Sequence, residues 1–229
     1  PPAPGSGEGA AARTSVVTLP VAAALAPTPP RQRRVLWDVF HSIRYPPAYL
    51  PRDNVDVRND ILDWHGDHPH TNYHAAFDHL RSKGWFVEVL GSPFTCFDAA
   101  DYAAVLLVDP EEEYGALERA KLESDVRDKG LGLVVFAEWY NVDTMRKMRF
   151  FDDNTHSYWT PVTGGANVPA LNDLLGAFGA ALSDEVVAGN VGTAGQRWPF
   201  ASGATIAAWP AGGAVQRASL QSKAAGGGG

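Results

Sequence analysis

The sequence predicts an α/β fold, a three-layer sandwich with a mainly parallel sheet of the flavodoxin-like or Rossmann-like kind. Four short, almost continuous apolar runs recur between residues 35 and 137. Such runs are typical of parallel strands that helices cover on both faces. Segments with apolar residues at helical spacing lie between and after the runs, and right-handed crossovers place these helices on the two faces of one sheet.

Length and composition are those of an ordinary globular protein. The chain has 229 residues, 45% of them hydrophobic, which suits one α/β domain with irregular ends. Its 26 Asp and Glu against 19 Lys and Arg argue against a nucleic-acid partner, because binding the phosphate backbone needs surplus cations. A single cysteine excludes the disulfide-stapled class. No apolar run reaches the roughly 20 residues that span a bilayer, so no membrane span is expected in this segment.

Two segments of different composition precede the predicted sheet. Residues 1–13, rich in Pro, Gly and Ala, are expected to be disordered, because they hold little apolar surface to offset the entropy of ordering. Residues 14–30 begin with a β-rich run that has no neighbour to pair with, and they end in Pro27, Pro29 and Pro30. We interpret them as the last strand of a missing preceding β domain, followed by a stiff linker.

Residues 31–188 are expected to form the α/β domain itself. Its predicted strands are residues 35–40, 85–90, 104–109 and 131–137. A helix is predicted between the first two strands, with Thr71 as its N-cap and Gly84 as its left-handed stop. Four residues mark its apolar face: Tyr73, Ala76, Phe77 and Leu80.

Two more helices are expected after the third strand. The three glutamates at residues 111–113 mark the start of one, since carboxylates favour the positive end of a helix dipole, and Gly130 marks its stop. Its inner face is expected to carry Leu122 and Val126. The other helix follows the Gly-Gly-Ala-Asn-Val-Pro segment at 164–169 and carries apolar residues at helical spacing: Leu171, Leu174, Leu175, Phe178 and Leu182.

The C-terminal part carries weaker signals. Within residues 189–220, a strand is predicted at 204–209 and a partner strand at 214–220, separated by the turn-forming Gly212 and Gly213. Residues 221–229 are expected to be a disordered tail. No closing strand and helix are visible, so we expect a sheet that is incomplete at its C-terminal edge.

A dense group of imidazoles and carboxylates lies at residues 63–70, with His74 close behind. His68 and His70 would point to one side of an extended chain, and His74 could complete a zinc or manganese site. The spacing matches no known metal motif, so the alternative is a polar loop at the carboxyl edge of the sheet in which Asp67 and His68 brace the backbone. We assign no metal ligand and keep His68, His70 and His74 as candidates.

Cys96 brings to mind the class I glutamine amidotransferases, whose folds are of this type. Their chemistry needs a thiolate on a glycine-flanked elbow between a strand and a helix. Cys96 lacks such glycines, so we expect it to be a small buried hydrophobe. The expected elbow at residues 137–141 holds neither Ser nor Cys, and no serine lies in a hydrolase motif. No catalytic or cofactor-binding residue is assigned, and no cofactor is expected.

Residues 163–167, Thr-Gly-Gly-Ala-Asn, precede the last predicted helix and could cradle an anion with free N–H groups. The segment matches neither a Walker motif nor the dinucleotide-binding fingerprint. A tight turn that ends in a helix cap is therefore the favoured interpretation.

Several longer segments follow one another in a specific order between about residues 19 and 213. They include Arg34-Val35-Leu36-Trp37-Asp38, Pro51-Arg52-Asp53-Asn54, Gly66-Asp67-His68, Pro93-Phe94-Thr95-Cys96-Phe97-Asp98-Ala99 and Glu111-Glu112-Glu113-Tyr114. In these segments the sequence resembles the membrane-bound site-1 proteases, a family of subtilisin/kexin-like serine endopeptidases. Residues 189–229 resemble the family only in patches.

The resemblance implies a place in a larger protease. The family works in the lumen of the endoplasmic reticulum and Golgi, is anchored by a C-terminal membrane helix and cleaves membrane-bound transcription factor precursors. This sequence is similar to the ancillary α/β domain that follows the catalytic domain. The catalytic Asp, His and Ser of the family lie in a region that this sequence does not contain, so none is carried over.

The resemblance therefore implies a non-catalytic structural or partner-binding domain, in a fragment of a site-1-protease-like subtilase. Its expected partners are other domains of the same protease and a luminal protein, contacted through the aromatic-rich residues 139–159. The alternative is a degenerate amidotransferase-like or metal-dependent hydrolase domain, which leaves the activity of this segment open.

Overall fold

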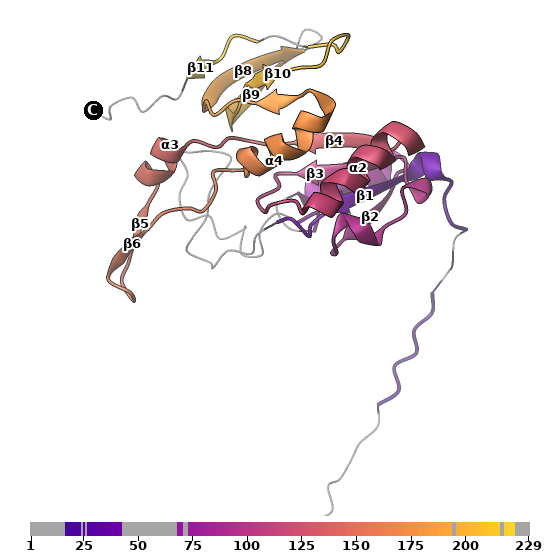
Figure 1. The fold of residues 1–229 in the computed structure, drawn as a ribbon. Helices are drawn as coiled ribbons and strands as arrows, with labels where there is room; N and C mark the ends of the chain where they lie inside the picture. The colour runs from indigo at the N-terminus through magenta and orange to yellow at the C-terminus, as the bar shows by residue number, and fades with distance from the viewer. Residues whose placement is uncertain are drawn as a thin grey trace, which may run out of the picture.

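The structure, a computed structural model, describes residues 17–23, 25, 27–42, 68–70, 73–193, 196–215 and 218–222. Within these residues, four parallel strands form the central sheet: β1 (Arg34–Asp38), β2 (Phe86–Leu90), β3 (Ala104–Val108) and β4 (Gly132–Phe136). Their order is β2-β1-β3-β4 (Figure 1). The four predicted strands and their parallel pairing are thus confirmed, and each end agrees to within two residues.

Alternate residues of the strands face two different helix layers. Val35, Trp37 and Leu106 pack with Phe77 of α1 (His74–Ser82) on one face of the sheet. Leu36, Val105 and Leu107 face the opposite way, toward α2 (Ala116–Lys129) and α4 (Val168–Leu175). Because successive side chains of a strand point to opposite faces, a run of apolar residues fills both layers. The predicted three-layer α/β sandwich is confirmed.

The two predicted glycine stops are confirmed. Gly84 and Gly130 have φ of +81° and +64°, the left-handed conformation that ends α1 and α2. Thr71, the predicted N-cap of α1, lies outside the described residues.

The predicted start of α2 at residues 111–113 is wrong. The helix begins at Ala116, because the Glu118 carboxylate accepts the backbone N–H of Gly115 and so fixes Gly115 as the N-cap. The backbone N–H groups of Glu111 and Glu112 donate to the carbonyl oxygen of His41 instead. The predicted inner face of α2 is confirmed: Leu122 is buried and Val126 packs against the same core.

The last helix is shorter than the apolar pattern of its sequence predicts. α4 ends at Leu175 and continues only as a 3-10 turn, η5 (Gly176–Phe178), which Gly179 ends with φ of +73°. Leu182, predicted on the helix, lies in the short strand β7 (Ala181–Leu182). Its side chain still packs against the core, which explains why it fits the helical pattern.

The C-terminal strands pair differently from the prediction. The strand predicted at 204–209 is present as β10 (Ile206–Ala208), but it pairs with β7, and the described part of residues 214–220 contains no strand. β8 (Val187–Thr193) and β9 (Gln196–Gly203) form an antiparallel hairpin that β11 (Gln221–Ser222) extends (Figure 1). The sequence did not predict this hairpin, because Gly189, Gly192 and Pro199 within it normally interrupt strands.

Two further elements lie between β4 and α4. The short helix α3 (Val142–Lys147) leads into a hairpin of β5 (Phe150–Asp152) and β6 (Ser157–Trp159), which projects from one end of the molecule (Figure 1). Three 3-10 turns complete the described elements: η1 (Arg31–Arg33), η3 (Phe94–Cys96) and η4 (Ala99–Asp101).

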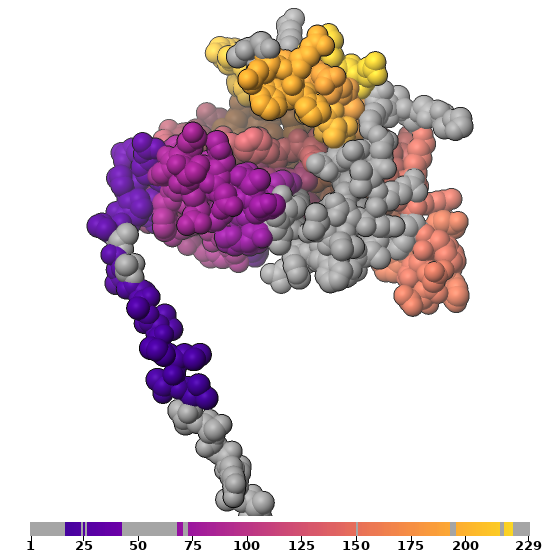
Figure 2. Space-filling view, turned by 180° about the vertical axis from the view of Figure 1, so that it is seen from behind, coloured from indigo at the N-terminus to yellow at the C-terminus, as the bar shows by residue number. Residues whose placement is uncertain are grey.

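The N-terminal segment stands clear of the sandwich (Figure 2). Its described residues, 17–23 and 25, have no strand assigned, and the side chains of Val17, Leu19 and Val21 are exposed. That it completes the sheet of a preceding domain stays a prediction. None of the helices described is long and apolar enough to cross a membrane.

Candidate functional site

Acidic side chains gather where the parallel strands end. Asp38 is the last residue of β1, Asp109 follows β3, and Glu138 comes two residues after β4. Asp38 and Asp109 are both buried. In open α/β sheets ligands bind at this carboxyl edge, so it is the first place to look for chemistry.

The most enclosed ionisable cluster at this edge consists of Asp38, His41 and Glu118. His41 Nδ1 lies 2.8 Å from Asp38 Oδ2, and His41 Nε2 lies 3.4 Å from Glu118 Oε1. The imidazole is only 1% exposed. Asp38 Oδ1 also accepts the N–H of Phe40 at 3.0 Å, which holds the turn that carries His41 beside the strand end.

Aromatic rings bury the imidazole, and two carboxylates set the electrostatics around it. The rings of Phe94 and Tyr114 lie with their centroids 4.7 and 4.5 Å from that of His41. Burial lowers the pKa of His41, but the hydrogen bond and charge of Asp38 together with the charge of Glu118 outweigh it, so the net shift is upward. Burial and the same two carboxylates raise the pKa of Tyr114 well above its ordinary value, which keeps the phenol neutral.

Among the residues that the structure describes, the cluster has two parts of a hydrolytic triad but no nucleophile. An Asp–His pair activates a Ser, Cys or Thr only when the second ring nitrogen reaches its hydroxyl or thiol. Within the described part of the chain, His41 Nε2 makes no hydrogen bond and faces the Glu118 carboxylate. The arrangement suits a charged brace between β1 and α2. Sequence reasoning missed these residues, although an Asp at a strand end followed three residues later by His was a visible signal.

The turn after β3 also lacks a nucleophile. It holds Asp109 with φ of +50°, a conformation that non-glycine residues seldom adopt. The N–H of Asp109 donates to the carbonyl oxygen of Phe136 at 2.7 Å, and Asp109 Oδ1 accepts the N–H of Glu138 at 3.3 Å. Asp109 therefore ties the ends of β3 and β4 together.

The Thr-Gly-Gly-Ala-Asn segment is a packing turn with a helix cap, as favoured above. The N–H groups of Gly165 and Ala166 donate to the carbonyl oxygen of Trp139, and that of Asn167 donates to Pro110. Asn167 Oδ1 caps α4 by accepting the N–H of Ala170 at 3.3 Å. These N–H groups are already used within the protein and do not form an anion cradle.

Of the three candidate histidines, His68 and His70 lie close together. His68 Nδ1 accepts the N–H of His70 at 3.0 Å, and the ring of His70 meets that of Phe77 edge-on at 4.6 Å. His74 is the exposed first residue of α1. In the described ranges no group of three His, Cys, Asp or Glu is placed to hold a metal ion, while residues 63–67 of the proposed loop, Asp67 among them, lie outside these ranges. That the loop is braced at the carboxyl edge of the sheet stays a prediction.

The expectation that Cys96 is buried is wrong. Its side chain is exposed, at the end of η3. The same tight turn directs Phe94 into the core, where it is fully buried against His41 and Tyr114. The larger apolar side chain of the turn thus takes the buried position.

The aromatic-rich residues 139–159 divide into core and surface. Trp139 and Met145 are buried and pack against Val186, so they do not form an interface. Tyr158 and Trp159 of β6 are 60% and 46% exposed. Within residues 139–159, the exposed aromatic side chains of Tyr158 and Trp159 therefore lie on the β5–β6 hairpin.

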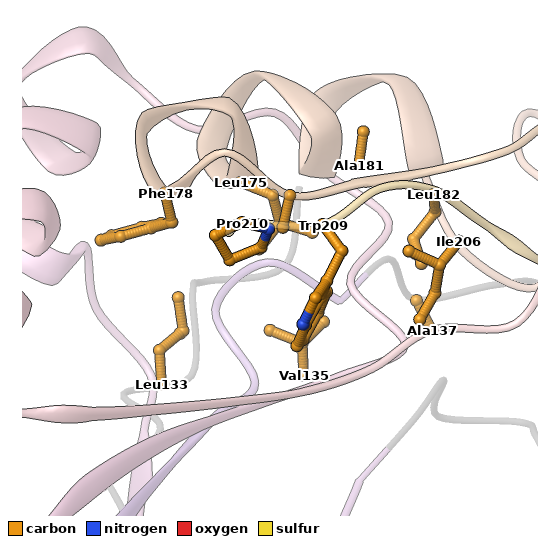
Figure 3. A pocket seen from close by; sticks show the side chains of 11 residues that line it. Leu133, Val135, Ala137, Leu175, Phe178, Ala181, Leu182, Ile206, Trp209 and Pro210 are labelled. Carbon is orange, nitrogen blue, oxygen red and sulfur yellow. The ribbon is translucent and has the colours of Figure 1, made fainter. Parts of the chain in front are cut away.

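An apolar cavity of about 430 Å³ lies beside the sheet on its α4 face. Figure 3 shows Leu133 and Val135 of β4 on one side, Leu175 and Phe178 opposite, and Trp209 reaching between them. No charged residue lines this cavity. It has none of the acid, base or nucleophile that catalysis requires.

Comparison with known proteins agrees with this architecture. The family model for "MBTPS1, fourth GATase-like domain" matches residues 29–228. Subtilisin-like protease SBT6.1 of Arabidopsis thaliana is 59% identical over 210 residues, which are 92% of this chain and 20% of that protein. The membrane-bound transcription factor site-1 proteases of Rattus norvegicus and Homo sapiens are 55% and 52% identical over 90% and 93% of the chain.

The chain spans about a fifth of the length of these relatives, with 19% of the rat protein and 20% of the human protein covered. It is thus homologous to one segment of the site-1 proteases, and its four-stranded parallel sheet is the core of that segment. The match over residues 29–228 shows that the chain belongs to the family of the fourth GATase-like domain of MBTPS1.

Proposed function

We propose that this chain is a non-catalytic domain of a site-1-protease-like subtilase and that it supports and docks the rest of that protease. The observation that carries the proposal is the buried Asp38–His41–Glu118 cluster, in which each ring nitrogen of His41 faces a carboxylate. A fold related to amidotransferases here uses its carboxyl edge for internal bracing.

The relatives suggest what the whole protease does. Two of them are named membrane-bound transcription factor site-1 protease, and a third is named a subtilisin-like protease. By homology, the parent of this chain would cleave membrane-bound transcription factor precursors in the lumen of the endoplasmic reticulum or Golgi. Its catalytic triad and its membrane anchor would lie in other segments.

The β5–β6 hairpin is the best candidate for the docking surface. Asp152 accepts the N–H of Asn154 and the hydroxyl of Thr155, and Trp159 Nε1 donates to Thr155 Oγ1 at 3.0 Å. These bonds hold the hairpin in one shape while Tyr158 and Trp159 stay exposed. Preorganised, exposed aromatic side chains are typical anchors of protein interfaces.

The occupant that we propose for this surface is another domain of the same protease. The chain covers only about a fifth of its relatives, so most of such a protease remains available to contact it. An intramolecular partner is present at high effective concentration, so even a small aromatic patch can hold it.

A binding experiment tests the docking role. The 229-residue chain is titrated against the catalytic segment of the same protease, supplied as a separate chain, and compared with a Tyr158→Ala/Trp159→Ala variant. We expect the variant to bind at least about tenfold more weakly. Trp198→Ala, which removes an exposed Trp from β9, is the matched control and should bind like the unmodified chain. Equal effects of both variants would refute docking through the hairpin.

An activity assay tests the hydrolase alternative, which rests on the Asp38–His41 pair. The purified chain is expected to hydrolyse no peptide with an Arg-x-hydrophobic-Leu site, because positioning without a nucleophile gives little rate. Turnover that persists across expression hosts and disappears in His41→Ala would establish the alternative.

A further inference from the structure

His41 connects the end of β1 with the segment that leads into α2, which lies far along the sequence. Its ring lies between Asp38, at the end of β1, and Glu118, in the first turn of α2. Its carbonyl oxygen accepts the N–H groups of Glu111 and Glu112 at 2.8 and 3.0 Å. Both the side chain and the backbone of His41 thus hold the segment that leads into α2.

Glu118 is the second centre of the same cluster. Its Oε1 accepts the N–H of Phe94 at 2.9 Å, and its Oε2 accepts the N–H of Gly115 at 2.9 Å. A movement of the Glu118 carboxylate would therefore affect both η3 and the N-cap of α2.

The number of protons on the His41 ring determines whether each of the two carboxylates faces an N–H group. An imidazolium has two N–H groups: that of Nδ1 donates to Asp38 at 2.8 Å, and that of Nε2 carries its share of the positive charge 3.4 Å from the Glu118 carboxylate. A neutral imidazole has one, so whichever carboxylate it does not serve faces a ring lone pair at close range. With the ring buried, water cannot relieve that repulsion.

Among the described groups that face the ring, none supplies a positive charge in place of the one that His41 loses on deprotonation. The charges that act on it are Asp38 from β1 and Glu118 from α2, and both are negative. Tyr114, Phe40 and Phe94 contribute neutral rings. Glu111 and Glu112 reach His41 through their backbone N–H groups.

We propose that Asp38, His41 and Glu118 form a proton-operated latch, which is closed when both ring nitrogens of His41 carry a proton and loosens when one proton is lost. The segment released would be the one between β3 and α2, which Glu111 and Glu112 anchor to His41. Because Asn167 donates its N–H to the carbonyl oxygen of Pro110 at 2.8 Å, the release would extend to the start of α4. This device is separate from the docking role and does not depend on it.

The direction of the pH effect follows from linkage. The net pKa of His41 in the folded protein lies above its ordinary value of 6.5, although burial opposes the shift. A raised pKa of this kind gives stability that is fully present below about pH 6.5 and is lost as the pH rises through the folded-state pKa. The latch is closed in mildly acidic solution and loosens on the alkaline side.

Two NMR measurements on the 229-residue chain test the latch. The first follows the ring nitrogen shifts of His41, which should report an imidazolium at pH values above 6.5, the ordinary pKa. The second follows the exchange protection factors of the Glu111 and Glu112 amides, corrected for intrinsic exchange. We expect these to fall at least about tenfold as the pH rises through the titration of the His41 ring, while those of Leu106 and Val134 in the sheet stay constant.

Variants distinguish a pH effect that arises at the Asp38–His41–Glu118 cluster from a general loss of amide protection across the protein. Glu118→Gln removes one carboxylate, so the loss of protection should move to lower pH, and His41→Gln should abolish the pH dependence. His79→Gln, at an exposed His of α1, should keep it. If His41→Gln fails to fold, the ring titration of the unmodified chain still decides. Titration of His41 at or below its ordinary pKa, or protection that does not follow that titration, would overturn the proposal.

Discussion

The guanidinium of Arg34, the first residue of β1, lies 2.7 Å from the carboxylate of Glu88, in the middle of the neighbouring parallel strand β2. Arg34 also stacks over the ring of Tyr102, with its Cζ 4.8 Å from the ring centroid. The hydrogen bond to Glu88 raises the pKa of Arg34, while burial and Glu88 raise the pKa of Tyr102 to about 12. These groups close the amino edge of the sheet.

Replacing Arg34 by Met should destabilise the protein by about 1–2 kcal/mol. The change removes the ion pair with the half-buried Glu88 and the planar group over Tyr102. Urea unfolding gives the free energy. Arg146→Met removes an exposed pair with Asp143 and should leave the midpoint almost unchanged. Equal midpoints for the two variants would contradict the role of Arg34.

Gly164 should not tolerate a side chain. A Cβ there would lie 2.7 Å from Cε3 of the buried Trp139 and would also overlap its carbonyl oxygen. We expect Gly164→Ala to cost at least about 2 kcal/mol, since neither atom can move away. Gly91→Ala is the control, because its Cβ would meet nothing within 4 Å. Thermal unfolding compares the two, and a Gly164→Ala variant as stable as Gly91→Ala would show that the turn is loosely packed.

The apolar cavity of Figure 3 can be partly filled. Ala137→Val adds two methyl groups beside Leu182 and Ile206, and we expect a gain of about 0.5–1 kcal/mol in the free energy of unfolding. Ala207→Val, at an exposed position of β10, tests whether the gain comes only from a better strand former. An equal gain at both positions would assign the effect to strand propensity.

Metal titration tests the histidine candidates. We expect no submicromolar binding of zinc or manganese to the chain, because the Nδ1 of His68 is used by the N–H of His70 and three convergent ligands are needed. Calorimetry on the unmodified chain measures this, with His68→Ala and His70→Ala alongside. Tight binding that both substitutions abolish would instead revive the metal-dependent hydrolase.

The sequence by itself determined the sheet, its flanking helices and the family. Val35, Leu36 and Trp37 are apolar in succession because helices cover both faces of β1, and this local pattern is readable without coordinates. Gly84 and Gly130 end helices because a left-handed residue without Cβ is a local requirement. The extended resemblance to the site-1 proteases needed only the order of residues along the chain.

Only the tertiary structure decided what happens at the carboxyl edge. The spacing of Asp38 and His41 is visible in the sequence, but only folding brings Glu118 to them, 77 positions after His41. The pairing of β8 with β9 and the outward turn of Cys96 likewise depend on long-range packing. Local periodicity shows which face of an element is apolar. It does not show which distant charge will meet a buried imidazole, because that contact is set by how the layers stack.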